Sequence, residues 1–204
     1  TDIAGPVGSG EFGRHVVPLP NGNIVVTDPG YSIPSGAAEV GAVYLFSGAD
    51  GSMISILTGS TAGDRIGENS FADKDGITVL ATGDFVVLSR DWSGTASRAG
   101  AVTWVDADTG LSGTISAANS LVGSSPNDEI GSFQIFPLSN GNYLVGSGNW
   151  DNGGVTNAGA LTFCKSDGST VGPVSTSNSL VGTHASSLVG SGVIRELANG
   201  NYVA

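Results

Sequence analysis

Basic residues are scarce in this sequence. Its 204 residues include 7 Lys and Arg against 18 Asp and Glu, which gives a formal net charge of −11. Proteins that bind nucleic acid or anionic lipid need clustered cations, because the phosphate groups of both carry negative charge. The composition therefore argues against nucleic acid as a partner.

Long apolar runs and cysteine pairs are lacking as well. No uninterrupted apolar run exceeds about five residues, far below the ~20 that span a bilayer, so no membrane insertion is expected. Cys164 is the single cysteine, which excludes an internal disulfide and any C-x-x-C site for zinc or redox chemistry. The hydrophobic fraction of 39% still indicates a folded chain, either one domain or one piece of a repeat array.

Internal repeats with a period near 59 residues organise the chain, and three landmarks mark them. The first is a strand opening that recurs every 59 positions: Gly41-Ala42-Val43, Gly100-Ala101-Val102 and Gly159-Ala160-Leu161. The second is a tight turn: Asn21-Gly22-Asn23, Thr82-Gly83-Asp84, Asn140-Gly141-Asn142 and Asn199-Gly200-Asn201. The third is an apolar residue before glycine: Phe12-Gly13, Ile66-Gly67, Ile130-Gly131 and Val189-Gly190. Its spacing drifts, because the second repeat has an insertion around residues 72–77.

These landmarks divide the chain into repeats. The segments are 1–12 (the end of a preceding repeat or a linker), 13–66 (repeat 1), 67–130 (repeat 2), 131–189 (repeat 3) and 190–204 (the start of repeat 4, incomplete). Interior strands without neighbours are an aggregation hazard, so we expect the last segment to be completed by more repeats of the array or by strand addition from another copy. Head-to-tail addition that does not close would produce a filament.

Each repeat is expected to hold four short strands and no helix. In repeat 1 these strands are 14–19, 24–28, 41–47 and 53–57. Asn-Gly joins the first two strands, because a tight hairpin turn needs positive φ values. Pro18 and Pro137 fall in first strands and Pro173 in a fourth strand, which makes these strands the sheet edges, since proline cannot donate to a ladder. The pattern predicts an all-β fold of four-stranded antiparallel repeats, arranged as β-propeller-like blades or, alternatively, as an open stack of the same sheets.

The residues resemble two kinds of known repeat. Phe12-Gly13, followed by a hairpin and by the strand 41–46, resembles the FG-GAP repeat of integrin-type propellers. The segments 119–123 and 178–182, both Asn-Ser-Leu-Val-Gly, and the segment 138–154 resemble more closely a bacterial repeat of unknown function. That repeat occurs in tandem in large secreted surface proteins of the filamentous-haemagglutinin type. The resemblance implies an extracellular or cell-surface location and brings no activity.

The FG-GAP resemblance also raises the question of calcium, because many such blades carry an acidic calcium loop at the first hairpin. Calcium takes six to eight oxygen ligands, including several carboxylates. Here the hairpin holds Asn-Gly-Asn three times, and only repeat 2 offers carboxylates, from Asp73, Asp75 and Asp84. These three residues are the candidate calcium ligands, and a solvated loop insertion is the other interpretation. No other cofactor is expected.

Three aromatic residues, Tyr31, Trp92 and Trp150, occupy equivalent positions, each ten residues after the start of its hairpin turn. Exposed, with Asp91 and Asp151 beside them, they would suit glycan binding, because a sugar stacks its apolar face on an aromatic ring. Alternatively, each ring packs at the seam between neighbouring sheets, which the repetition of the position favours.

No catalytic residue is assigned. The Gly8–Gly13 match to G-x-G-x-x-G precedes an expected strand, whereas a dinucleotide site needs a helix there. Nucleophile motifs are missing, and Cys164 is expected to be a packed thiol. Asp64 and Asp128, each three residues before a landmark glycine, are expected to cap turns.

The sequence thus predicts a non-catalytic, extracellular bacterial surface protein with a structural or adhesive role, which assembles into a filament or array through its terminal repeat. The alternative is a lectin-like module assisted by calcium. The expected partners are further repeats of the same kind, copies of the chain, and surface glycans.

Overall fold

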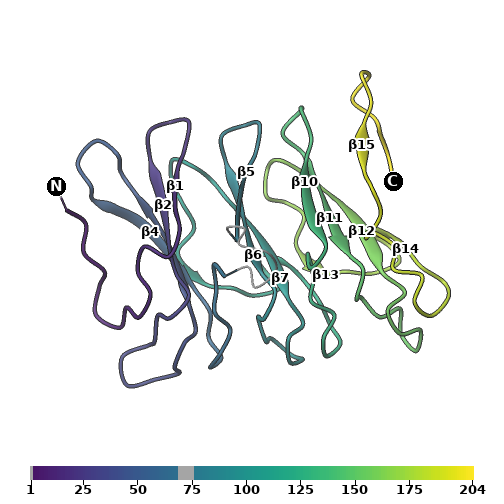
Figure 1. Cartoon of the computed structure of the whole chain (residues 1–204), viewed down its shortest axis with the longest axis horizontal. Helices are drawn as coiled ribbons and strands as arrows, with labels where there is room; N and C mark the ends of the chain where they lie inside the picture. The colour runs from purple at the N-terminus through teal and green to yellow at the C-terminus, as the bar shows by residue number, and fades with distance from the viewer. Residues whose placement is uncertain (1, 69–75) are drawn as a thin grey trace.

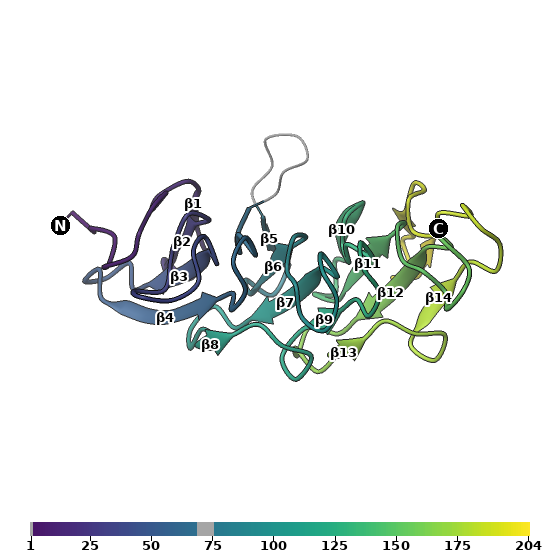
Figure 2. The same ribbon diagram turned by 90° about the horizontal axis from the view of Figure 1, so that it is seen from below.

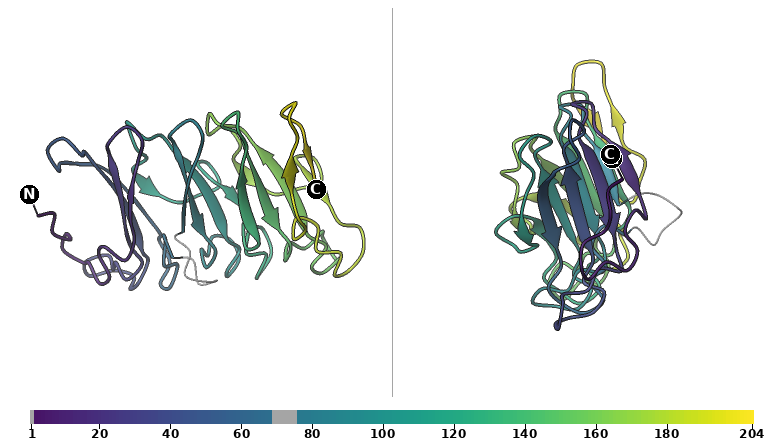
Figure 3. Two further views of the ribbon diagram at one scale, coloured as in Figure 1. Left: turned by 45° about the horizontal axis from the view of Figure 1, so that its top comes forward. Right: turned by 90° about the vertical axis from the view of Figure 1, so that its left-hand side faces the viewer.

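A row of small β-sheets makes up the protein. The computed structural model describes residues 2–68 and 76–204, and these residues form strands, turns and loops without any helix. In the described segments there is accordingly no helix with the length and apolarity needed to cross a membrane. The N- and C-termini lie at opposite ends of the row (Figure 1), and the sheets overlap when viewed along it (Figure 3, right). The all-β repeat fold is confirmed, in the open-stack form.

The strands follow the repeats in chain order. Repeat 1 holds β1 (Val16–Pro18), β2 (Ile24–Asp28), β3 (Ala42–Phe46) and β4 (Met53–Thr58). Repeat 2 holds β5 (Ile77–Val79), β6 (Phe85–Ser89), β7 (Ala101–Val105), β8 (Gly113–Thr114) and β9 (Leu121–Val122). Repeat 3 holds β10 (Gln134–Pro137), β11 (Tyr143–Ser147), β12 (Ala160–Cys164), β13 (Gly172–Pro173) and β14 (Ser179–Val181). The hairpin β15 (Arg195–Glu196) and β16 (Tyr202–Val203) follows.

The first three strands of each repeat form an antiparallel meander, as the turn residues predicted. Val17 pairs with Val25, and Val25 pairs with Leu45 on the opposite side. Every residue of β3 and β6 is buried, which explains their continuous apolar runs, because both faces of these strands are covered. Pro18 and Pro137 end β1 and β10, the outer strands of their sheets, where no ladder donor is needed.

Repeats 2 and 3 each contain one strand more than the expected four. β8 of repeat 2 lies parallel to β4 of repeat 1, where Gly113 pairs with Leu57, and β13 of repeat 3 lies parallel to β9 of repeat 2. We call β8 and β13 the joining strands, since each extends the sheet of the preceding repeat; Figure 2 shows both along one side of the row. Pro173, expected in the fourth strand of its own sheet, lies in a joining strand instead. β14 completes that sheet, with Val181 opposite Ala160.

Repeat 1 contains no joining strand. The chain passes from β3 to β4 through the turn 47–52, which Gly51 N closes by donating to Ser47 O at 2.8 Å. In repeats 2 and 3 a longer segment separates the third strand from the strand that completes the sheet, and the joining strand lies within it.

The two largest apolar clusters lie between neighbouring sheets. Leu45 and Leu57 of repeat 1 belong to the same buried cluster as Phe85 and Trp92 of repeat 2. A second cluster unites Leu121 and Ile130 with residues of repeat 3. A repeat of this size buries little apolar surface alone, so its stability depends on its neighbours.

Candidate functional site

The junction between neighbouring repeats holds a repeated set of polar contacts, and it is the candidate functional site. Its backbone arrangement repeats three times: Arg65 N donates to Glu39 O, Glu129 N to Arg98 O and Leu188 N to Asn157 O, at 3.1–3.2 Å. Next to each pair stands the glycine of the strand-opening landmark. A Cβ at Gly100 would lie 2.2 Å from Ile130 N, and its φ is +76°, so only glycine fits.

The Asp64 carboxylate fastens two repeats together. Its Oδ2 accepts hydrogen bonds from Ser60 N at 3.0 Å and Thr61 N at 2.9 Å, which is the expected turn cap. Its Oδ1 accepts a third bond, 2.9 Å long, from Ser93 N in the next repeat.

Asp128 makes the same contacts one repeat later. Oδ2 accepts from Ser124 N and Ser125 N at 2.8 Å, and Oδ1 accepts from Asp151 N at 3.0 Å. Burial raises the pKa of both the Asp64 and the Asp128 carboxyl, and the backbone N–H donors oppose this rise. The turn-capping prediction is confirmed, and the bond to the next repeat adds a role that the sequence did not show.

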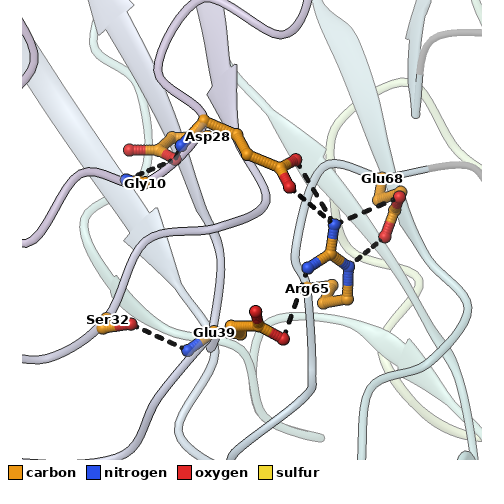
Figure 4. Close-up of polar contacts among 7 residues, drawn as sticks. Gly10, Asp28, Ser32, Glu39, Arg65 and Glu68 are labelled. Atoms are coloured by element: carbon orange, nitrogen blue, oxygen red, sulfur yellow. Dashed lines mark hydrogen bonds and ion pairs between the residues drawn. The ribbon is translucent and has the colours of Figure 1, made fainter.

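Ion pairs lie beside the same junctions. The Arg65 guanidinium lies between the carboxylates of Glu39 and Glu68 (Figure 4), and it also contacts Glu11 at 3.2 Å. In repeat 2 the nearly buried Glu129 takes the central place, where Arg90 and Arg98 both pair with it. Asn149 Nδ2, from repeat 3, donates to Glu129 Oε2 at 2.8 Å.

Of the three equivalent aromatic residues, Trp92 and Trp150 lie in the seams between sheets, and Tyr31 packs edge-on against Tyr44 within repeat 1. Trp92 and Trp150 are only 6% and 4% exposed, each within the core that two neighbouring repeats share, and Tyr31 is partly exposed. Trp92 and Trp150 of the aromatic set considered for glycans are therefore covered by apolar side chains, and glycan binding stays a prediction. Seam packing accounts for the position of the two tryptophans.

The acidic neighbours of these aromatics have structural partners. Asp91 Oδ1 lies 3.1 Å from Arg98 Nη2. Asp151 Oδ1 accepts a 2.7 Å hydrogen bond from Asn157 N. Both carboxylates thus hold the long loop that leads into the third strand of their repeat.

Of the candidate calcium ligands, Asp84 lies within the described residues, and Asp73 and Asp75 lie outside them. Asp84 Oδ1 accepts a 3.0 Å bond from Ala107 N, and Asn142 Oδ1 accepts the equivalent bond from Ser166 N at 2.9 Å. A neutral amide thus fills the same role one repeat later. Residues 2–68 and 76–204 contain no group of three His, Cys, Asp or Glu side chains that could hold a metal. The calcium hypothesis stays a prediction.

Cys164 is a packed thiol, as expected. Its side chain is fully buried on β12, and burial raises its pKa to about 12. A thiol with this pKa is not a nucleophile at neutral pH.

One protein family matches the chain, the Repeat of unknown function (DUF5650), over residues 18–68, 79–132 and 137–191. These segments cover well over half of the chain and correspond to three tandem repeats. The chain belongs to this repeat family. The family description names no activity, and no curated protein matches the chain.

Sequence reasoning missed two features of these DUF5650 repeats. One is the joining strand: the only signal for it is the longer segment after the third strand in repeats 2 and 3. The other is the pairing of Glu39 with Arg65 and of Arg98 with Glu129. The sequence did contain a signal for this pairing. Glu39 and Arg98 occupy equivalent positions, and the residues that pair with them carry the opposite charge.

Proposed function

We propose that this chain is a non-catalytic structural scaffold, a run of DUF5650 repeats that builds an elongated array on the bacterial surface. The observation that carries the proposal is the junction, which the protein builds from the same parts each time. A joining strand, a core shared between two sheets and an aspartate bonded across the boundary recur from repeat 1 to 2 and from repeat 2 to 3. Such neighbour-to-neighbour packing is how repeat proteins form extended bodies.

The chemistry of the polar groups supports a structural role. Asp64, Asp128 and Glu129 are the three buried acids of the junctions, and each is held by backbone amides or by arginine. Catalytic acids and bases need a position where substrate reaches them. The oxygens of these carboxylates instead accept hydrogen bonds that fix one repeat to the next.

The proposed surface location and adhesive role rest on a resemblance of the sequence. It resembles FG-GAP repeats and the repeats of large secreted proteins of the filamentous-haemagglutinin type. The scarcity of cations and the single buried cysteine are compatible with an extracellular setting.

Small-angle scattering of the full 204-residue chain, with its mass measured by light scattering, tests the scaffold. We expect an elongated particle and no turnover of a panel of glycosides, esters and peptides. A matched variant, Gly100→Ala, should disturb the junction between repeats 2 and 3 and change the scattering profile. A compact, rounded particle or reproducible turnover would contradict the proposal.

A further inference from the structure

The outer edge of the last complete sheet is bare where the two earlier sheets are covered. Leu57 of β4, Leu121 of β9 and Leu180 of β14 are equivalent, because each lies opposite the second residue of its neighbouring third strand: Val43, Val102 and Leu161. Leu57 is 2% exposed and Leu121 is 0% exposed, whereas Leu180 is 64% exposed. The same position is thus buried at two junctions and open at the third.

The joining strands are what covers this edge at the inner junctions. Ile115 N donates to Thr58 O at 3.0 Å, and Val174 N donates to Val122 O at 2.9 Å. By the same register, the next acceptor in this series is the carbonyl of Val181. β14 therefore presents a strand edge whose partner in each earlier sheet is a parallel strand from the following repeat.

A pocket accompanies the open edge. It has a volume of about 330 Å³, and its apolar lining includes Leu161, Leu180, Leu188, Val189 and Ile194. At the inner junctions the joining strand brings one apolar side chain into the shared core, namely Ile115 or Val174, each 3% exposed. We expect the joining strand of a following repeat to place such an apolar side chain in this pocket.

We propose that the β14 edge and this pocket are a docking site for the joining strand of a further repeat of the same family. The ligand is a short extended segment with glycine first, then Thr or Pro, then a β-branched apolar residue, as in Gly113-Thr114-Ile115 and Gly172-Pro173-Val174. This inference rests on the proposed scaffold function and names its partner.

The geometry also specifies which repeats qualify as that partner. Repeat 1 of a second copy does not, because its turn 47–52 replaces the joining segment. The joining strands β8 and β13 of a second copy are already paired within their own chain. The occupant must therefore be a joining strand other than β8 and β13, from a repeat that follows repeat 3 in the array.

The direct test adds a synthetic peptide of residues 168–177 to the full chain and follows amide hydrogen exchange and fluorescence anisotropy. We expect slower exchange at residues 179–181 and saturable binding, at least tenfold weaker for the same peptide with Val174→Asp. Leu180→Lys, which changes an exposed side chain and so leaves the fold intact, should weaken binding at least tenfold. The matched control Val193→Lys, at a residue 70% exposed and outside the pocket lining, should leave it unchanged.

A second measurement guards against a peptide that is too short to bind. The same segment is fused to the C-terminus through a flexible Gly-Ser linker, which raises its effective concentration to the millimolar range. The melting temperature should rise with the native segment and not with the Val174→Asp segment or in the Leu180→Lys chain. Absence of both peptide binding and this rise, or binding that Leu180→Lys leaves intact, overturns the docking site. An elongated particle in that case would leave the scaffold proposal standing, whereas a compact particle would overturn the scaffold itself.

Discussion

Arg98 Nη2 lies 2.8 Å from Glu129 Oε1, and one repeat earlier the two equivalent positions hold Glu39 and Arg65 with the charges exchanged. In repeat 3 the same positions carry the uncharged Asn157 and Leu188, and the backbone bond between them is kept. The junction therefore keeps the backbone hydrogen bond in all three repeats, whereas the side-chain pair changes from oppositely charged to uncharged.

Glu129→Gln should destabilise the protein by about 2 kcal/mol, because the variant loses charge-assisted hydrogen bonds in a nearly buried position. The loss is read from the urea concentration at the midpoint of unfolding. The control, Glu39→Gln, changes an acid whose side chain is 60% exposed and should cost at most about 0.5 kcal/mol. Equal losses for the two variants would show that burial at Glu129 does not matter.

Asp128→Asn should lower stability by about 1–3 kcal/mol. The carboxylate accepts three backbone hydrogen bonds with its two oxygens, whereas an amide turns an N–H donor toward at least one of these backbone N–H groups. Thermal unfolding measures the effect. Asp167→Asn is the matched control, since this exposed turn residue accepts only from Ser169 and an amide oxygen replaces that bond. An unchanged melting temperature for Asp128→Asn would contradict its role in joining two repeats.

Much of the fold could be predicted from local chemistry. Asn21-Gly22 and Asn140-Gly141 require positive φ at glycine, so they fixed the hairpins, and the apolar runs of β3 and β6 gave the interior strands. The joining strands could not be found in this way. Gly113-Thr114 and Gly172-Pro173 are too short for any periodicity, and the strands that they pair with lie in another repeat.

Gly100→Ala should destabilise the protein by more than about 3 kcal/mol, because a Cβ would lie 2.2 Å from Ile130 N in addition to occupying a positive φ. Gly83→Ala separates the two effects. Its φ is +97° and nothing lies within 4 Å of the added carbon, so only backbone strain of about 1 kcal/mol is expected. Chemical denaturation compares the pair, and a smaller loss at Gly100 than at Gly83 would refute the close approach.

Trp150→Ala should cost about 3–5 kcal/mol, as expected for removal of a large side chain from the core between repeats 2 and 3. Phe133→Ala, at a ring that is 46% exposed, should cost less. In the unmodified chain, added glycans should leave tryptophan emission unchanged. A saturable shift in that emission would favour the lectin alternative over seam packing.

Stability should fall as the pH rises through the window in which buried Cys164 resists ionisation. Burial raises its pKa from 9.0 to about 12, so between these values the native state keeps a proton that the unfolded state has lost. Ionisation therefore favours unfolding as the pH rises. The urea concentration at the midpoint of unfolding should be lower at about pH 11 than at about pH 8, and this difference should be smaller in Cys164→Ala. The native thiol should also react with a thiol reagent only after unfolding, and rapid reaction of the folded chain would contradict its burial.

The candidate site was harder to predict than the fold. Asp64 and Asp128 were recognised as turn caps because the cap is local, within four residues of each carboxylate. Their third bonds, to Ser93 and Asp151, depend on how two sheets pack and leave no trace in the spacing. The repetition of the aromatic position favoured seam packing, and the core shared with the neighbouring repeat buries Trp92 and Trp150 there.

The joining strand makes the length of such a protein adjustable in whole steps. Each one pairs with the sheet of the adjacent repeat, so removing or duplicating an internal repeat would rebuild a junction from the same parts and leave distant repeats untouched. A gene that encodes these repeats in tandem could thus shorten or lengthen its product by recombination without a new interface having to evolve. The end-to-end length of the protein would then change in evolution while the fold of each repeat stays the same.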